Sequence, residues 1–225
     1  MEETEEIEAF VFDAYGTLFD VYSVYATCEK VFPGQGEAIT RLWRVKQLEY
    51  SWLRTAMGRY EDFWKLTEDG LRYTCQFLRL EASPAQLEEL LQVYLKLELY
   101  PDVLPALTHL AGSGRKQAIL SNGSPQMLAA VVKNADIGGL LDAVISVDEV
   151  GRYKPDPLVY QLAPTRLGLA KEKIGFVSSN AWDAAGAKSF GFKVFWINRL
   201  GAPIEQLGLT PDYIINSAGD LLTLY

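Results

Sequence analysis

The feature that most constrains the fold is a regular alternation of strand-like and helix-like segments after Pro101. Helical patterns separate five short, largely apolar runs, which lie at residues 116–121, 142–147, 173–179, 193–198 and 211–216. Such alternation is typical of a parallel sheet that is covered by helices on both faces. A sixth buried run, IEAFVF at residues 7–12, is expected to join the same sheet although it lies far away in the chain.

The segment between these two parts has a different pattern. From about residue 23 to residue 100 large apolar residues recur at helical spacing, as in Ile39, Trp43 and Leu53. Ser83 followed by Pro84 is typical of a helix start. The pattern predicts about four helices and no strand. We therefore expect an α/β core formed by residues 1–20 and 101–225, with an all-helical domain inserted at residues 21–100.

Composition limits the classes of partner and the cellular location. The chain has 225 residues, 49% of them hydrophobic, which is enough for one sizeable core with a smaller insert. Its net charge of −8 disfavours a nucleic acid or an anionic membrane as partner. No apolar stretch approaches the roughly 20 residues that span a bilayer. The acidic start MEETEE is expected to be a solvated tail, unlike a signal peptide, so a cytoplasmic location is predicted.

Cysteine and histidine usage argues against several kinds of site. Cys28 and Cys75 fit neither a disulfide framework nor a zinc motif, so we expect two buried free thiols. His109 is the one histidine, and it falls off the apolar stripe of its helix, which includes Leu104. A solvated His109 leaves no residue for a Ser-His-Asp mechanism or for a multi-histidine metal site.

Polar residues gather where the predicted strands end. Asp13 follows the first strand, residues 121–123 (SNG) follow the second, Lys154 lies beyond the third, and residues 178–180 (SSN) precede Asp183. Each group alone is ordinary turn chemistry. Parallel sheets bind ligands beyond the carboxyl ends of their strands, so four such groups on one edge predict a site there.

The motifs at these positions resemble those of the haloacid dehalogenase superfamily. They are FDAYGTLFD, LSNGSP, YKPDPLVY and VSSNAWD, in that order, and a cap-sized gap separates the first two. The resemblance implies a Rossmann-like core with a helical cap inserted after the first strand. Phosphatases of this superfamily carry a second Asp two residues after the nucleophile and further acidic residues in the fourth motif. This chain has Tyr15, Ser178 and Asn180 there, which argues against magnesium-assisted phosphoryl transfer.

One branch matches more closely, the L-2-haloacid dehalogenases, through FDAYGTLFDV, LWRVKQLEYSWLR, LSNGSP, YKPD and VSSNAWDAAGA. That resemblance implies that Asp13 attacks C2 of a short L-2-haloalkanoic acid and forms an aspartyl ester. Water would then hydrolyse the ester and release a D-2-hydroxy acid, with no metal ion or other cofactor. Lys154 would be the counter-charge that keeps Asp13 ionised, although a lysine beside a turn is usually solvated.

The resemblance also implies roles for the other matching positions. Arg44 would hold the leaving halide, helped by the Asn122 amide, although a solvent-facing arginine is the ordinary alternative. Ser121 and backbone N–H groups just after Asp13, starting at Ala14, would bind the substrate carboxylate. The walls of the substrate pocket would be Tyr15, Leu48, Phe63 and Trp182, of which the last two could equally be core aromatics. Val45 departs from some relatives, which carry a polar residue there, and could shift substrate preference.

The remaining implied roles concern the nucleophile and the hydrolytic water. Thr17 would hydrogen-bond the nucleophile or its loop, and Ser178, Asn180 and Asp183 would position the water, with Asp183 as base. Residues 179–183 could instead be a plain helix N-terminus. Tyr160 would support Lys154 and Asp183, its alternative being a helix face packed on the sheet.

Two other classes of function stay open at this point. One is a phosphatase-like enzyme that acts on small phosphoesters, and the other is a non-catalytic member of the fold that binds an anion or a protein. A homodimer is a further expectation from the family, which the apolar cap helices permit.

Overall fold

The centre of the protein is a parallel sheet of six strands in the order β3-β2-β1-β4-β5-β6. The computed structural model describes residues 7–224, so the predicted acidic tail lies outside the described residues. The strands are β1 (Ala9–Phe12), β2 (Lys116–Ser121), β3 (Ala143–Ser146), β4 (Ile174–Ser178), β5 (Lys193–Ile197) and β6 (Tyr213–Ile215). The first strand pairs with β2 and with β4, which confirms that the N-terminal run joins the C-terminal sheet.

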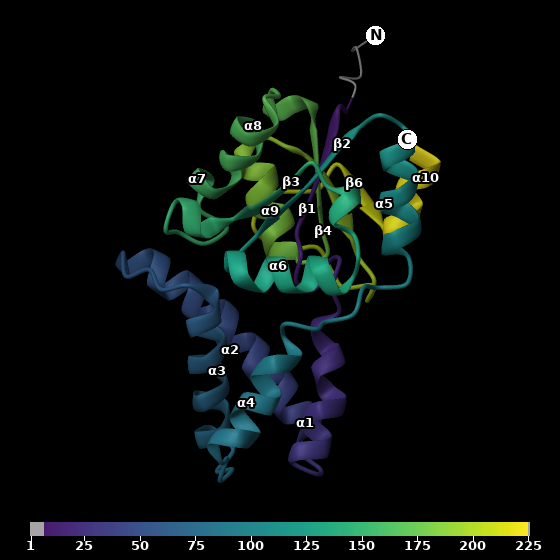
Figure 1. Ribbon diagram of the computed structural model, residues 1–225. Coiled ribbons are helices and arrows are strands. Elements are labelled where there is room, and N and C mark those ends of the chain that lie inside the picture. Colours follow the sequence, from purple (N-terminus) through teal and green to yellow (C-terminus); the bar gives the residue numbers. More distant parts are fainter. Residues whose placement is uncertain (1–6, 225) are drawn as a thin grey trace.

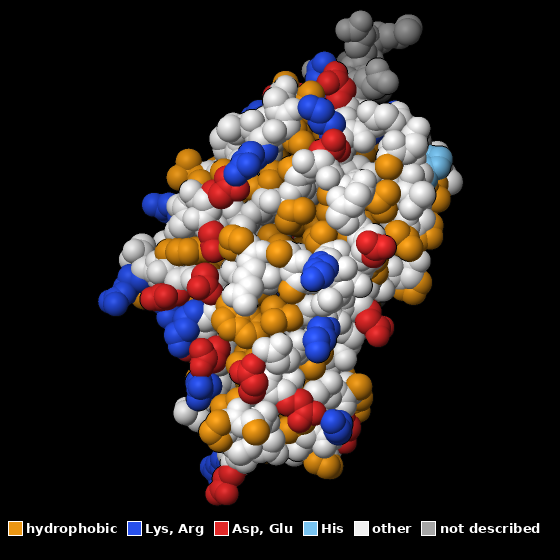
Figure 2. Space-filling model, in the orientation of Figure 1, with side chains coloured by type: hydrophobic (Ala, Val, Ile, Leu, Met, Phe, Trp, Pro, Cys, Tyr) orange, Lys and Arg blue, Asp and Glu red, His pale blue; other side chains and the backbone are white. Residues whose placement is uncertain are grey.

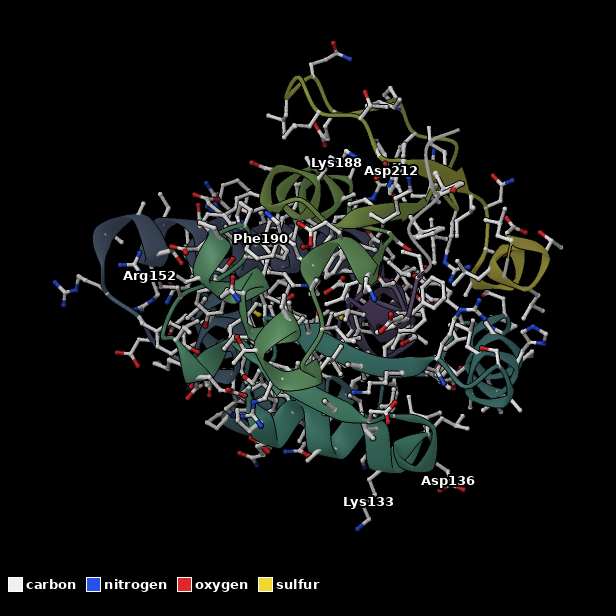
Figure 3. The ribbon with its side chains drawn as sticks, turned by 90° about the horizontal axis from the view of Figure 1, so that it is seen from above. Lys133, Asp136, Arg152, Lys188, Phe190 and Asp212 are labelled. Carbon is white, nitrogen blue, oxygen red and sulfur yellow. The ribbon has the colours of Figure 1, made fainter. Side chains whose placement is uncertain are left out.

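Helices cover both faces of this sheet, as the alternating pattern predicts. They are α5 (Val103–Gly112), α6 (Pro125–Asn134), α7 (Pro157–Tyr160), α8 (Leu162–Leu167), α9 (Ala181–Phe190) and α10 (Leu221–Leu224). Right-handed crossovers that lead outward from β1 in opposite directions place α6 and α9 on opposite faces. Figure 3 shows this arrangement: Lys133 of α6 lies below the sheet, whereas Lys188 of α9 lies above it beside its ion-pair partner Asp212.

The helical layer lies beyond the carboxyl ends of the strands (Figure 1). Its helices are α1 (Tyr25–Val31), α2 (Gly36–Met57), α3 (Phe63–Phe77) and α4 (Pro84–Val93), and no strand lies between residues 21 and 93. The fold class is therefore an α/β core with an all-helical insertion, as predicted. The exact domain boundaries at residues 20 and 101 stay predictions. The Ser83 hydroxyl caps α4 as expected, and Gly58 ends α2 with a φ of 65°.

The two chain segments that join the core to the helical layer run beside each other. The Asp20 N–H donates to the Glu98 carbonyl at 2.8 Å, and the Tyr100 N–H donates to the Leu18 carbonyl at 3.0 Å. Their pairing fixes where the helical layer leaves and re-enters the core, and so it places α2 over the end of β1.

Burial confirms some of the sequence predictions and corrects others. Cys28 and Cys75 are buried free thiols, and His109 is exposed, as expected. Leu53 and Leu104 are exposed, contrary to their placement on apolar stripes. No helix among residues 7–224 is long and apolar enough to cross a membrane.

Candidate active site

Asp13 follows β1 directly and is nearly buried, with 6% of its surface exposed. Its Oδ1 accepts a hydrogen bond from Lys154 Nζ at 3.0 Å. Its Oδ2 accepts from Thr17 Oγ1 at 3.0 Å and from Asn180 Nδ2 at 2.7 Å. Three donors from three segments thus hold one carboxylate in a fixed orientation at the edge of the sheet.

Lys154 lies between two carboxylates and is 1% exposed. Its ammonium is 3.0 Å from Asp13 Oδ1 and 3.0 Å from Asp183 Oδ2. Burial opposes the charge on Lys154, but the two carboxylates outweigh it and hold the pKa of the ammonium above its usual range. The solvated alternative is wrong, because this lysine is the central cation of the site.

Asp183 is fully buried on the first turn of α9. Burial raises its pKa to about 6, and the Lys154 ammonium opposes this rise. The pKa of Lys154 rises as well because one ammonium serves two carboxylates, which leaves a surplus of negative charge. Tyr160 donates from its hydroxyl to Asp183 Oδ1 at 2.7 Å. Burial, and then the nearby Asp183, raises the pKa of Tyr160, so the phenol stays a donor.

Hydroxyl groups connect the loop after β1 to the loop after β4 and order the second of these loops. Thr17 Oγ1 accepts from the Ser179 N–H at 2.8 Å while it donates to Asp13. Ser178 Oγ accepts from the Asn180 N–H at 3.1 Å, so in this structure it orders its own loop rather than contacting Asp13. Asn180 in turn also donates to the Tyr15 carbonyl at 3.1 Å.

Arg44 reaches the end of β1 from α2 and is 8% exposed, so the solvent-facing alternative is wrong. Its Nη2 donates to the Tyr15 carbonyl at 3.2 Å, and its buried Nη1 has no partner within the described residues. Gly16 lies beside this arginine, and a Cβ there would make only ordinary contacts, 3.5 Å from Asn180 Nδ2 and 4.0 Å from Arg44 Nη2. Its φ of 91° is what favours glycine. Sequence reasoning missed Gly16.

Ser121 is the last residue of β2, Asn122 begins the loop after it, and both are buried. Ser121 Oγ accepts from the Gly123 N–H at 3.0 Å, and Asn122 Oδ1 accepts from the Lys154 N–H at 3.0 Å. Asn122 therefore joins the segment that carries the lysine to the loop after β2. Ala14, directly after Asp13, is fully buried.

Aromatic side chains pack together on the side of the site that faces the helical layer. Tyr15 and Phe63 are buried, with ring centroids 6.1 Å apart, and burial raises the pKa of the Tyr15 hydroxyl well above its usual range. Leu48 and Trp182 are half-buried. Val45, by contrast, is 55% exposed on α2, and its effect on substrate preference stays a prediction.

Sequence reasoning also missed Arg199, in the loop after β5. Its Nη1 is 2.9 Å from Asp102 Oδ1, its Nη2 donates to the Thr17 carbonyl at 3.3 Å, and its guanidinium lies 4.2 Å from the Tyr100 ring centroid. No local motif marks an arginine that acts through such long-range contacts.

The donor set does not fit a magnesium ion. The two carboxylates that could bind one, Asp13 and Asp183, share the Lys154 ammonium, and a divalent cation would compete with it. Tyr15, Ser178 and Asn180 offer no further carboxylate. Within residues 7–224 no group of three or more His, Cys, Asp or Glu side chains is placed to hold a metal.

Comparison with known proteins identifies the family. The family model of haloacid dehalogenase-like hydrolases matches residues 7–191. The chain belongs to this family. (S)-2-haloacid dehalogenase H-109 of Pseudomonas putida is 49% identical, over 96% of this chain and 97% of the relative.

Two solved structures of the family are also similar to this one. The L-2-haloacid dehalogenase RSc1362 has a TM-score of 0.96 and 47% identity, with 97% of this chain and 98% of the other covered. The L-2-haloacid dehalogenase of Xanthobacter autotrophicus with chloropropionic acid covalently bound has a TM-score of 0.92 and 44% identity, with the same coverage.

Proposed function

We propose that this member of the family is an (S)-2-haloacid dehalogenase, a hydrolase that converts short L-2-haloalkanoic acids to D-2-hydroxy acids through an aspartyl ester and without a metal ion. The observation that carries the proposal is the Asp13 carboxylate, which a buried lysine, an amide and a hydroxyl hold in place. The covalently bound chloropropionic acid in the Xanthobacter autotrophicus structure supports a covalent route.

In the first step an oxygen of Asp13 attacks C2 from the side opposite the halogen. The new C2–O bond forms as the carbon–halogen bond breaks, and the halide leaves with the bonding electrons. The configuration at C2 inverts once. Arg44, whose Nη1 is free among the described residues, supplies a donor for the charge that develops on the halide, and Asn122 lies on the same loop edge. Ser121 and the backbone N–H groups that follow Asp13, starting at Ala14, bind the substrate carboxylate.

In the second step water attacks the carbonyl carbon of the Asp13 ester. Asp183 takes the proton from this water, and Tyr160 and Lys154 orient its two oxygens. The bond between the Asp13 carbonyl carbon and the oxygen on C2, which came from Asp13, then breaks, and the departing alkoxide takes the proton from Asp183. The D-2-hydroxy acid leaves with the inverted C2, and the Asp13 carboxyl, which now carries one oxygen from water, loses its remaining proton to solvent and is a carboxylate again. Thr17, Ser178 and Asn180 hold the nucleophile and its loop in one orientation during both steps.

The proposal includes a cytoplasmic homodimer whose small-molecule partners are a 2-haloacid and water, with no nucleic acid and no membrane. Acidic and basic side chains are interspersed over the face drawn in Figure 2, without a broad basic patch, which supports the exclusion of nucleic acid. Exposed Leu53, Met57 and Phe77 give the helical layer apolar surface for a second copy. Light scattering tests this part, because a mass of one chain at working concentration would refute the dimer.

Halide release from (S)-2-chloropropionate in the presence of a chelator tests the activity. We expect chelator-independent release of chloride and of a D-hydroxy acid, and we expect Asp13→Asn to release none while it stays folded. Single turnover in ¹⁸O-water should place the label in Asp13 and not in the first product. Magnesium-dependent hydrolysis of an aryl phosphate with no chloride release would instead favour the phosphatase alternative.

A further inference from the structure

One cavity beside the site is not used in the chemistry described above, although two residues of the site, Lys154 and Trp182, line part of it. Its volume is about 420 Å³, and it lies between α2, the segment after β3 and the start of α9. Its lining is Trp52, Thr55, Ala56, Tyr153, Lys154, Pro155, Asp156, Trp182 and Leu207. Trp52, Ala56 and Leu207 are exposed, so the cavity opens to solvent at that end. We call it the α2 cavity.

The α2 cavity is close to the nucleophile. Lys154 lines the cavity, and its ammonium is 3.0 Å from Asp13 Oδ1. The cavity therefore lies within one lysine side chain of the reacting carboxylate. Trp182 also lines it, packed edge-on against Trp52 with ring centroids 5.4 Å apart.

One face of α2 connects the reacting centre to this cavity. Arg44, Leu48, Trp52 and Ala56 follow one another at intervals of four residues, so they lie along one face of the helix. Arg44 lies at the end of β1, whereas Trp52 and Ala56 line the cavity. An apolar chain that leaves the nucleophile along Leu48 would thus be guided towards the Trp52–Trp182 pair.

We propose that the α2 cavity is a subsite for the alkyl tail of 2-haloalkanoic acids longer than chloropropionate. The proposal rests on the proposed function and extends its substrate class. Its two indoles, the Tyr153 ring, Pro155 and Leu207 offer apolar surface, and each methylene that leaves water there improves binding about fourfold. A tail that binds equally in the ground state and the transition state acts mainly on KM.

The test compares kcat/KM for (S)-2-chloropropionate and (S)-2-chlorohexanoate, measured by chloride release. The variant Ala56→Glu places a charge in the cavity, and Ala38→Glu is the matched control, because Ala38 is exposed on the same helix, outside the cavity lining, and undergoes the same substitution. For Ala56→Glu we expect at least a tenfold fall with chlorohexanoate, mostly in KM, and less than a twofold change with chloropropionate. Ala38→Glu should change neither value by more than twofold.

Two results would overturn the inference, and they differ from each other. If chloropropionate is turned over but the wild-type protein is far slower with chlorohexanoate, or if both variants affect the two substrates equally, the cavity takes no tail. If neither substrate releases chloride, the proposed function itself fails and the subsite with it.

Discussion

Arg44 and Lys154 are two buried cations with different surroundings. Lys154 is paired with two carboxylates, whereas Arg44 donates to a backbone carbonyl and keeps a buried N–H without a partner among the described residues. An unpaired buried donor costs free energy unless a ligand satisfies it. The difference supports the proposed roles, in which Lys154 holds the nucleophile and Arg44 binds an anion.

Arg44→Ala should therefore slow halide release without unfolding the protein. We expect kcat to fall on the order of 10²–10³, by analogy with the loss of a donor to a developing anion. Steady-state chloride release measures the effect. Arg41→Ala is the control, because Arg41 lies on the same helix and makes an exposed ion pair with Glu37. Near wild-type kcat in Arg44→Ala would contradict the halide role.

Asp183 predicts a pH dependence of the second step. It acts as base only when ionised, and burial raises its pKa to about 6, so kcat should fall as the pH drops below about 6. Because this pKa lies above the ordinary value of 3.8, the folded protein holds more protons than the unfolded chain between the two, and the contribution of Asp183 to stability falls as pH rises through that window.

Rapid-quench kinetics between pH 4.5 and pH 8 separate the two steps. We expect ester to accumulate on Asp13 at low pH, and in Asp183→Asn at every pH, detected as an increase in intact protein mass. If the low-pH loss instead appears in the chloride burst, the first step carries the pH dependence and Asp183 is not the base of the second step.

Single residues differ in how well the sequence predicts them. Asp13, Lys154 and Asp183 could be placed because strand ends and motifs carry them, and the structure brings both carboxylates within hydrogen-bond distance of Lys154. Gly16 could not, because its φ of 91° is set by the turn that the loop after β1 makes, in which the Gly16 N–H donates to the Phe19 carbonyl.

Among the elements, the two segments that join the layers depend on one arginine. Arg199 pairs with Asp102, stacks on Tyr100 and donates to the carbonyl of Thr17, whose hydroxyl donates to Asp13. It thus connects the return from the helical layer to the loop that holds the nucleophile.

Arg199→Gln should disturb this connection. We expect kcat to fall about tenfold with little change in KM, because the nucleophile loses orientation rather than substrate contact. The free energy of unfolding should fall by about 1–3 kcal/mol, since Asp102 loses a charged partner. Arg199→Lys should restore part of the stability.

Chloride release and urea unfolding measure the two effects of Arg199→Gln. Arg152→Gln is the control, because it removes an exposed i,i+4 ion pair with Asp156. An unchanged kcat in Arg199→Gln, with reduced stability, would show that the arginine has only a structural role.

Elements were predictable where the local pattern decides them. The strand expected at residues 116–121 is β2 with the same bounds. The helix break expected near Pro164 lies earlier, at Gln161 between α7 and α8, and Pro164 itself is inside α8. The burial of particular side chains was less predictable. Leu53 and Leu104 fit apolar stripes but are exposed, because helical spacing does not determine which neighbours cover a helix.

For the whole molecule, the net negative charge disfavours the binding of an anionic substrate. A protein of charge −8 repels a carboxylate, and salt screens this repulsion as the Debye length falls from about 30 Å at 0.01 M to about 8 Å at 0.15 M. We expect KM for chloropropionate to fall by about twofold over this range. A non-halide salt is required for the measurement, because halide would bind at Arg44. A rise in KM instead would mean that local cations at the site outweigh the net charge.

The fold as a whole was predictable because strand and helix periods alternate over half of the chain. The position of the helical layer over the sheet edge was not, since it depends on contacts such as Tyr60 with Asp148 and Tyr153 with Glu61, which join residues far apart in sequence. The family resemblance supplied that arrangement.

The shared ammonium of Lys154 has a consequence for the covalent intermediate. Once Asp13 is esterified it carries no charge, so Lys154 is left with Asp183 alone and the buried cluster becomes neutral. In the proposed intermediate the charges of Lys154 and Asp183 therefore cancel. The loss of the Asp13 charge also lowers the pKa of Asp183, so that more of it is ionised when a base is needed. Release of the product returns the excess negative charge and resets the nucleophile.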